Sequence, residues 1–294
     1  MKIAVAIPTY GREEVLLDTI SQLLLQTRLP DEILVIDQTE EHFKKTSDQL
    51  KEWHKQGKIR WIFQFPPNLP LARNRAIDET IADVLIYIDD DVVLNRNFVK
   101  AHLSNYRDKD IHAVSGHVVQ RKGWPKRPKR KRWDKILDYR YFALDGDIRV
   151  KGIANFCGAN HSVRVDYLKA IGGYDKEFMG WAFREDTDAA IRLWKSGAKI
   201  VFDPKTSLLH LAAPMGGCRI TKAIPEWMIS YPATWFAIKH FFPGYIFWLD
   251  VFFLNVRKYV LRKQNIRRPW VFPYAIASYI YGVILGFWRR AQNV

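Results

Sequence analysis

The stretch "YIDDDVVL" (residues 87–94) sets three consecutive carboxylates directly after the apolar run of residues 84–88. Like charges repel one another, and burial raises the free-energy cost of each ionised group further. In extended backbone, residues i and i+2 point to the same side, so Asp89 and Asp91 should converge while Asp90 points away. The stretch therefore predicts a compensating partner at the end of a buried strand: solvent, a divalent metal ion or a reacting group.

Apolar runs alternate with segments of helical periodicity along the first ninety residues. Strands are expected over residues 2–8, 32–37, 58–65 and 84–88, and helices over 12–26, 40–56 and 71–82. Near-continuous apolar strands joined through helices indicate a parallel sheet with helices on both faces. Ligands of such α/β folds bind beyond the carboxyl ends of the strands, where Thr9–Tyr10, Asp37 and Asp89–Asp91 are expected.

The glycine-rich nucleotide motifs are missing from the sequence. No G-x-G-x-x-G follows the first strand, which argues against dinucleotide binding, and no G-x-x-x-x-G-K-[ST] loop occurs. The start, "MKIAVAIPTYGREE", has neither the apolar length nor the cleavage site of a signal peptide. The two cysteines, Cys157 and Cys218, form no disulfide framework and fit a reducing compartment.

The 294 residues include 46 Lys and Arg against 31 Asp and Glu, a net charge of +15. A charge of this size favours an anionic partner, either nucleic acid, anionic lipid or a phosphorylated substrate. No nucleic-acid-binding motif accompanies the charge, so we expect no nucleic-acid partner. The basic segment 121–133 holds eight Lys or Arg residues and is either a solvated loop or a contact to an acceptor or lipid phosphate.

Two hard oxygen ligands on one side of a strand suit Mg²⁺ or Mn²⁺. Such an ion keeps open positions for phosphate oxygens and stabilises a departing diphosphate. The alternative without a ligand is a solvated acidic turn. A D-x-D-x-[TV] string after an apolar strand also resembles haloacid-dehalogenase-type phosphatases, in which Asp89 would be an aspartyl-phosphate nucleophile.

A second acidic pair, Glu185 and Asp186, precedes "TDAAIRLWKSG" (residues 187–197), whose apolar positions fall on one helical face. The helix dipole stabilises an ionised carboxylate at a helix start. Facing a bound substrate, an ionised carboxylate can accept a proton from a hydroxyl group. The pair is therefore either a general base with its support or an ordinary acidic helix cap.

Eight strings resemble the motifs of a family 2 glycosyltransferase with the GT-A fold, and they run in family order from residue 3 to about residue 211. They read "AIPTYGR", "ILVIDQT", "LPLARNRAI", "LIYIDDDVVL", "GANHSVR", "IGGYDKEF", "REDTDAAIRLWKSG" and "SLLHL". Each string is weak alone, whereas their order and spacing are specific. The dehalogenase pattern fits less well, because three strands precede its expected nucleophile strand. The resemblance implies a Rossmann-like, mostly parallel sheet and an inverting glycosyltransferase.

The resemblance also implies site residues for the donor. Pro8, Thr9, Tyr10 and Asp37 would line the pocket for the nucleotide base and ribose, and Arg73 would approach the base or the diphosphate. The second strand of the family usually ends in D-D-G-S, whereas this chain has Asp37–Gln38–Thr39. The loop after Asp37 is therefore expected to make different contacts to the base.

The remaining implied roles concern the metal ion and the base. Asp89 and Asp90 would contact the ribose, and Asp89, Asp91 and His210 would hold Mn²⁺ or Mg²⁺. Asp186 would be the general base, supported by Glu185. By resemblance, the enzyme transfers a sugar from a UDP-, GDP- or dTDP-linked donor to a hydroxyl of a glycan or lipid-linked acceptor, in cell-surface polysaccharide synthesis. The alternatives are an aspartyl-phosphate phosphotransferase using Asp89 and a basic membrane-binding module without activity.

Composition shifts after about residue 226, which predicts a catalytic domain over 1–225 and an apolar, basic helical region over 226–294. Residues 270–288 carry no charge in 19 residues and are long enough to span a bilayer. Residues 241–256 are nearly as apolar, and six basic residues lie between the two segments. Exporting that basic loop would contradict the positive-inside rule, which argues against a hairpin of two spans.

We expect instead an in-plane amphipathic α-helix over residues 245–262, with its basic face toward anionic headgroups. At 100° per residue, Trp248, Phe253 and Val260 fall on its apolar side. This places the protein peripherally on the cytoplasmic face of the membrane. The alternatives are one transmembrane segment over 270–288 and a buried helix pair that packs on the catalytic domain.

Overall fold

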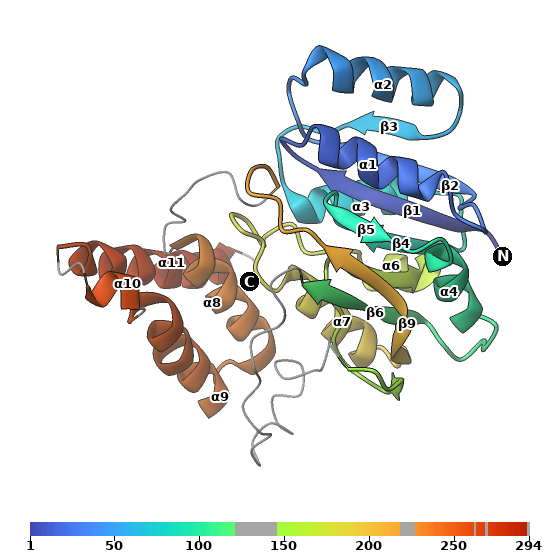
Figure 1. Ribbon diagram of the computed structural model, residues 1–294. Coiled ribbons are helices and arrows are strands. Elements are labelled where there is room, and N and C mark those ends of the chain that lie inside the picture. Colours follow the sequence, from blue (N-terminus) through green and yellow to red (C-terminus); the bar gives the residue numbers. More distant parts are fainter. Residues whose placement is uncertain (121–145, 218–226, 262, 268–269, 293–294) are drawn as a thin grey trace. The chain divides into compact units, whose positions relative to one another are not determined.

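The computed structural model describes the chain except residues 121–145, 218–226, 262, 268–269 and 293–294, and it divides into two compact units (Figure 1). The first unit comprises Met1–Tyr174 and Asp186–Arg219, and the second comprises Asp175–Glu185 and Ile220–Val294. The basic segment 121–133 lies outside the described residues. Each unit has its own buried core.

The first unit is an α/β fold with one central sheet. Its strands are β1 (Ile3–Thr9), β2 (Glu32–Asp37), β3 (Arg60–Phe63), β4 (Val84–Ile88), β5 (Val92–Leu94), β6 (Ala113–Gln120), β7 (Val150–Lys151), β8 (Asn160–Arg164) and β9 (Ile200–His210). Its helices are α1 (Glu14–Leu23), α2 (Lys44–Lys55), α3 (Leu69–Glu79), α4 (Phe98–Asn105), α6 (Val165–Ala170) and α7 (Glu185–Lys195).

The strand order is β3-β2-β1-β4-β8-β6-β9-β5, with β7 paired to β9. The four predicted strands are all present, and β3, β2, β1 and β4 pair in parallel as expected. Beyond β4 the sheet is mixed, because β8 runs antiparallel to both β4 and β6 while β6 and β9 are parallel. The predicted α/β class is confirmed.

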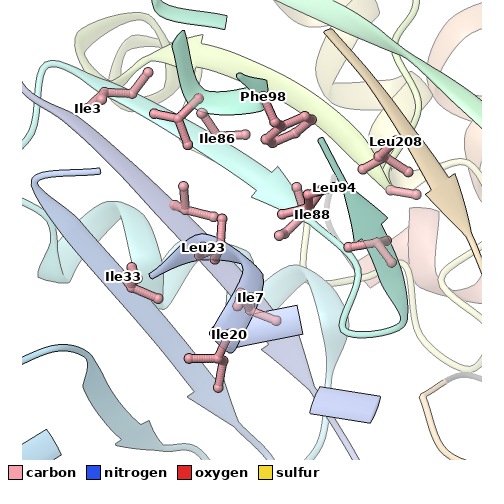
Figure 2. Packing of buried hydrophobic residues seen from close by; sticks show 14 of the residues in the cluster. Ile3, Ile7, Ile20, Leu23, Ile33, Ile86, Ile88, Leu94, Phe98 and Leu208 are labelled. Carbon is pink, nitrogen blue, oxygen red and sulfur yellow. The ribbon is translucent and has the colours of Figure 1, made fainter. Parts of the chain in front are cut away.

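The sheet is buried on both faces, which explains why its strands read as continuous apolar runs rather than alternating ones. Ile3, Val5 and Ile7 of β1 join one core cluster, which includes residues of α1, α2 and α4. Ala4 and Ala6 of the same strand face the opposite cluster, which includes residues of α3, α6 and α7. Figure 2 shows residues of the first cluster, among them Ile7, Ile20 and Ile88.

The second unit is helical. Its elements are α8 (Trp227–Phe241), α9 (Tyr245–Trp248), the π-helix η2 (Leu249–Val260), α10 (Lys263–Ile266) and α11 (Phe272–Gln292). Helices α8 and α11 pack closely, because a Cβ on Gly282 would lie 2.0 Å from Oγ of Ser230 and one on Gly286 would lie 2.9 Å from Cγ2 of Thr234. Glycine thus allows the backbones of these two helices to approach.

The predicted amphipathic α-helix over 245–262 is wrong in its helix type. Most of that stretch is η2, whose i to i+5 hydrogen bonds give a wider turn, so a 100° step no longer assigns its faces. Val260 accordingly belongs to the core of the second unit, while Trp248 and Phe253 are exposed.

The alternative membrane span, residues 270–288, falls mostly in α11, one face of which is buried within the second unit. Among the helices that the structure describes, none has both the length and the apolarity that crossing a membrane requires.

Candidate active site

The strand order brings four strand ends to one edge of the sheet. Thr9 at the end of β1 is in register with Asp37 at the end of β2. Strand β4 ends just before Asp89, and Val92 of β5 pairs with His210 at the end of β9. Residues from four distant parts of the chain therefore meet where α/β folds bind ligands.

Asp89, Asp91 and His210 offer ligand atoms that all lie within 4.8 Å of one another. Nε2 of His210 lies 3.1 Å from Oδ1 of Asp91 and 3.5 Å from Oδ2 of Asp89. Nδ1 of His210 lies 3.1 Å from Oε1 of Gln120, and an Nδ1–H that donates there leaves a lone pair on Nε2. The three residues expected to bind a metal ion are brought together in a geometry that one divalent cation can occupy.

Asp90 does not belong to this group of ligand atoms. Its carboxylate is buried and accepts hydrogen bonds from Oγ1 of Thr9 at 2.8 Å and from Nε of Arg12 at 3.0 Å. Burial raises the pKa of Asp90 to about 7, although Arg12 and Thr9 oppose the shift. Thr9 and Asp90, both expected at the ribose, thus contact each other directly.

Asp89 and Asp91 differ in the direction of their pKa shifts and in their exposure. Burial and the charge of Asp91 raise the pKa of Asp89, against the attraction of His210. For Asp91, burial is outweighed by His210, the amide of Ala213 and Arg12, so its pKa is lowered. The Asp91 side chain is 1 % exposed, whereas that of Asp89 is 37 % exposed, so Asp89 is the one of these two carboxylates that solvent reaches.

Arg12 is a residue of the site that the sequence interpretation missed. Its buried guanidinium contacts Asp90 and, through Nη2, Oδ2 of Asp91 at 3.3 Å, and its Nη1 donates to the carbonyl of Met215. The residue stands in the quoted string "AIPTYGR". The sequence did contain a sign of this role. An arginine stands just beyond the end of a strand, and the same fold carries three adjacent carboxylates whose negative charge needs compensation.

Asp37 lies at the side of the site where the base was expected, and its carboxylate is already bonded. Oδ2 accepts hydrogen bonds from Nε2 of His42 at 2.7 Å and from Nε1 of Trp61 at 2.8 Å, and Oδ1 accepts one from the amide of Thr39 at 2.9 Å. These bonds outweigh burial and lower the pKa of Asp37. His42 and Trp61 were not anticipated from the sequence.

His42 provides a pH-dependent contribution to stability. Burial opposes its protonation, but hydrogen bonds and attraction from Asp37 and Glu13 outweigh burial and raise the pKa of His42. A histidine whose pKa is raised by folding contributes its full stabilisation below its pKa in the unfolded state, about 6.5. This contribution is lost as the pH rises through the pKa of the folded state. We therefore expect His42→Gln to lower the unfolding free energy by about 1 kcal/mol near pH 6 and by less at pH 9, in chemical denaturation.

His112 is the matched control for this prediction. Burial lowers its pKa, so its contribution has the opposite sign and His112→Gln should not lose its effect at high pH. A stability difference between wild type and His42→Gln that stays constant from pH 6 to 9 would contradict the assignment.

Gln38 explains the departure from the family pattern after Asp37. Its buried side chain donates from Nε2 to the carbonyl of Thr9 at 3.3 Å and accepts at Oε1 from the amide of Asn68 at 2.6 Å. Asn68 in turn caps α3 by accepting from the amide of Leu71 at 2.9 Å. Gln38 therefore ties the ends of β1 and β2 to the start of α3, next to the expected base pocket.

Asp186, at the start of α7, is held by two backbone amides. Oδ2 accepts from Gly158 at 2.7 Å and Oδ1 from Thr187 at 2.7 Å. The carbonyl of Gly158 accepts from Nη2 of Arg73 at 3.2 Å, so one glycine connects Asp186 to Arg73. Burial, Asp186 and, more weakly, Asp89 raise the pKa of the Cys157 thiol to about 12, which sets both carboxylates near that thiol.

Arg73 is only 2 % exposed and lies among aromatic rings, with its guanidinium carbon 5.3 Å from the ring centre of Tyr174 and 6.0 Å from that of Tyr87. Its positive charge also acts on Asp89 and favours the ionised carboxylate. Glu185, expected to support Asp186, is buried at 3 % exposure. The structure thus places Arg73, Asp186 and Asp89 around one region of the site.

The chain is similar to known glycosyltransferases. It is 21 % identical over 249 residues to the O-antigen biosynthesis protein RfbC of Myxococcus xanthus and 22 % identical over 209 residues to the probable glycosyltransferase YdaM of Bacillus subtilis. These matches cover 79 % and 69 % of this chain, but only 19 % and 49 % of the respective relatives. The chain therefore spans about a fifth to about half of the length of these curated relatives.

Solved structures share the fold. The mannosyltransferase PcManGT from Pyrobaculum calidifontis, in complex with GDP-Man and Mn²⁺, superposes with a TM-score of 0.57 at 16 % identity, covering 94 % of this chain and 73 % of the other. TarS residues 1–349 from S. aureus superpose with a TM-score of 0.58 at 13 % identity, covering 96 % and 81 %. These likenesses confirm the predicted GT-A fold.

The family comparison is decisive for identity. A model named "N-terminal domain of galactosyltransferase" matches residues 149–212. The model named "Glycosyl transferase family 2" matches residues 4–172, more than half of the chain. This stretch contains β1, Arg12, Asp37, Arg73 and the three aspartates of the site. The chain therefore belongs to glycosyl transferase family 2.

Proposed function

We propose that the protein transfers a sugar from a nucleoside-diphospho-sugar to an acceptor hydroxyl, with inversion at the anomeric carbon and with Mn²⁺ or Mg²⁺ as cofactor. The observation that carries the proposal is the convergence of Asp89, Asp91 and His210 within 4.8 Å at the carboxyl edge of the sheet. The phosphotransferase alternative is set aside, because family membership leaves Asp89 no separate nucleophilic role.

The donor atoms of the site fit such an ion. Two carboxylates provide hard oxygen ligands and His210 adds an imidazole nitrogen, a set suited to Mn²⁺ and compatible with Mg²⁺. When bound, the ion supplies positive charge against the diphosphate as it leaves. The structural neighbour PcManGT, solved with GDP-Man and Mn²⁺, supports this assignment.

Asp186 is proposed as the general base. The amides of Gly158 and Thr187 hold its carboxylate in one orientation, so a free lone pair can face an acceptor hydroxyl. Glu185 supports the start of the same helix. An attack by that hydroxyl from the face opposite the diphosphate inverts the anomeric carbon. Arg73 fixes Gly158 and adds positive charge toward Asp89, where the negative charge of the leaving group develops.

The donor pocket is assigned to the edge formed by β1 and β2, where Pro8, Thr9, Tyr10 and Asp37 lie and where UDP-, GDP- or dTDP-linked sugars are the candidates. The name of the O-antigen relative supports an acceptor that is a glycan or a lipid-linked sugar of a cell-surface polysaccharide. Thermal protection by a panel of nucleotide-sugars, with and without Mn²⁺, tests the proposal. No protection by any donor in the presence of Mn²⁺ would contradict it.

We further propose that the second unit binds the anionic cytoplasmic surface of a membrane. Residues 241–294 carry eight basic residues and one acidic residue. On α11, Tyr274, Ile280, Ile284 and Trp288 recur at helical spacing and are each 50 to 62 % exposed. Aromatic and aliphatic side chains on one face, together with many basic residues, are typical of helices that lie in the membrane interface.

Changing Arg257, Lys258, Arg262 and Lys263 to glutamine should weaken binding to anionic vesicles about a thousandfold. Each basic residue near such a surface contributes about 1 kcal/mol if the effects add. Among the four, Arg257 is described as exposed, while the side chains of the other three lie outside the described set. The measurement is vesicle co-sedimentation at low and high salt, because salt screens these charges.

The control for this experiment removes the same charge from the first unit. Lys51, Lys55, Lys58 and Arg107 are exposed there, and their change to glutamine should leave vesicle binding close to wild type. Equal losses in both variants would mean that net charge alone binds the membrane. An unchanged affinity in the first variant would also contradict the proposal.

A further inference from the structure

Residues 211–217, which we call the return segment, follow His210 directly and fold back onto the loop between β1 and α1. The amide of Gly217 donates to the carbonyl of Tyr10 at 2.6 Å, and Nη1 of Arg12 donates to the carbonyl of Met215. The segment therefore links one candidate metal ligand, His210, to the loop that carries Arg12.

The return segment also contacts the second buried ligand, Asp91. The amide of Leu211 donates to the backbone carbonyl of Asp91 at 2.9 Å, and the amide of Ala213 donates to its Oδ2 at 2.7 Å. Nη2 of Arg12 reaches the same Oδ2 at 3.3 Å. Oδ2 is thus held by two donors, while Oδ1 faces Nε2 of His210 at 3.1 Å. Asp91 is presented to the metal position through one oxygen.

The closed position of the segment depends on glycine. Gly216 has φ +84°, and a Cβ there would lie 2.4 Å from the carbonyl oxygen of Gly11 and 2.8 Å from Cδ of Arg12. Gly11 also has a positive φ, of +60°. An alanine at position 216 would strain the backbone and collide with the β1–α1 loop, so the segment could not close in this way.

From these contacts we infer that Arg12 is a positioning residue, which joins the closed return segment to Asp91 and so sets the affinity of the site for a divalent cation. The inference rests on the proposed function, because it concerns the same metal site. Three different nitrogens of the Arg12 guanidinium bond Asp90, Asp91 and the Met215 carbonyl, whereas lysine has a single nitrogen in place of this planar group.

Two substitutions test the inference from opposite sides of the contact. Gly216→Ala should displace the return segment without changing any charge. Arg12→Lys should keep the positive charge but lose the planar guanidinium with its several N–H donors. Removing a group that orients a metal ligand weakens metal affinity about 10- to 100-fold. The readout is Mn²⁺ binding to the purified full chain, from the free Mn²⁺ signal in electron paramagnetic resonance, with Mn²⁺ alone and with added UDP, GDP or dTDP.

Each variant has a matched control away from the site. Gly57→Ala introduces the same kind of backbone strain at φ +69°, with no neighbouring atom within 4 Å of the new Cβ. Arg60→Lys removes a guanidinium that binds Glu32 and Glu79 at the other end of the strands. Both controls should bind Mn²⁺ as wild type does, even where their melting temperature falls.

The outcomes separate the inference from the proposed function. Wild-type Mn²⁺ affinity in both Gly216→Ala and Arg12→Lys, whatever their melting temperatures, would overturn the inference and leave the proposed function intact. Tighter Mn²⁺ binding in Gly216→Ala would overturn it as well. If Arg12→Lys does not fold, Gly216→Ala decides alone. Wild-type protein that takes up no Mn²⁺ under any of these conditions would contradict the proposed function itself.

Discussion

Asp91→Ala is expected to abolish Mn²⁺-dependent nucleotide binding. Asp91 is buried, and its Oδ1 lies 3.1 Å from Nε2 of His210 within the group proposed to bind the ion. Removing a charged ligand there costs on the order of several kcal/mol, which is a loss of more than about a hundredfold in affinity. The measurement is calorimetric titration of the nucleoside diphosphate that protects the wild type, in Mn²⁺ and again after its removal with EDTA.

Asp110→Ala is the control for the loss of one carboxylate. Asp110 is exposed and pairs with Lys199 at 2.6 Å, away from the strand ends of the site. Its removal should leave nucleotide affinity unchanged, because an exposed ion pair contributes little. Mn²⁺-dependent affinity that survives in Asp91→Ala would mean that Asp91 does not bind the metal ion.

Asp186→Asn should reduce sugar transfer by a factor on the order of 10² to 10⁴ while donor binding persists. The amide retains the shape of the carboxylate and the hydrogen bond that Oδ1 accepts from Thr187, but it is not basic enough to accept the acceptor proton. The expected signature is a fall in kcat with little change in the affinity for the donor. Steady-state transfer assays and donor titration on the same preparation provide both values.

Asp166→Asn distinguishes catalysis from helix capping. Asp166 stands in the first turn of α6 and accepts from the amide of Tyr167 at 2.9 Å, much as Asp186 accepts from the amide of Thr187 at 2.7 Å. Asp186→Asn also loses the bond from the Gly158 amide and should lower stability more than Asp166→Asn does, but only Asp186→Asn should slow transfer. Near wild-type transfer in Asp186→Asn would reduce Asp186 to a helix cap.

Much of the arrangement is determined locally by the sequence. The apolar runs predict β1, β2, β3 and β4, and parallel pairing follows from the helices between them. The predicted convergence of Asp89 and Asp91, from their i and i+2 spacing, agrees with the group of ligand atoms to which both belong. The order of the family motifs added His210, which lies far along the chain, and the structure places it with the two aspartates.

Other features depend on contacts that only the tertiary structure decides. Arg12 and Asp90 are 78 positions apart, and Arg12 and Met215 are 203 apart, so no local pattern relates them. Their meeting depends on where β9 inserts in the sheet and on a return segment without regular structure. The bonds of Asp37 to His42 and Trp61 likewise depend on the course of the α2 connection.

In the C-terminal region, too, a local sequence pattern did not predict which side chains are buried. A sequence wheel assumes the α-helical step, and η2 departs from it, so Val260 is buried while Phe253 is exposed. Neighbouring helices contact this stretch, and the Tyr279 hydroxyl donates to the carbonyl of Val251. The positions of the first strands and the end points of local motifs are thus encoded in short-range periodicity, whereas the partners of buried polar groups are selected by which distant donors the fold brings within hydrogen-bonding distance.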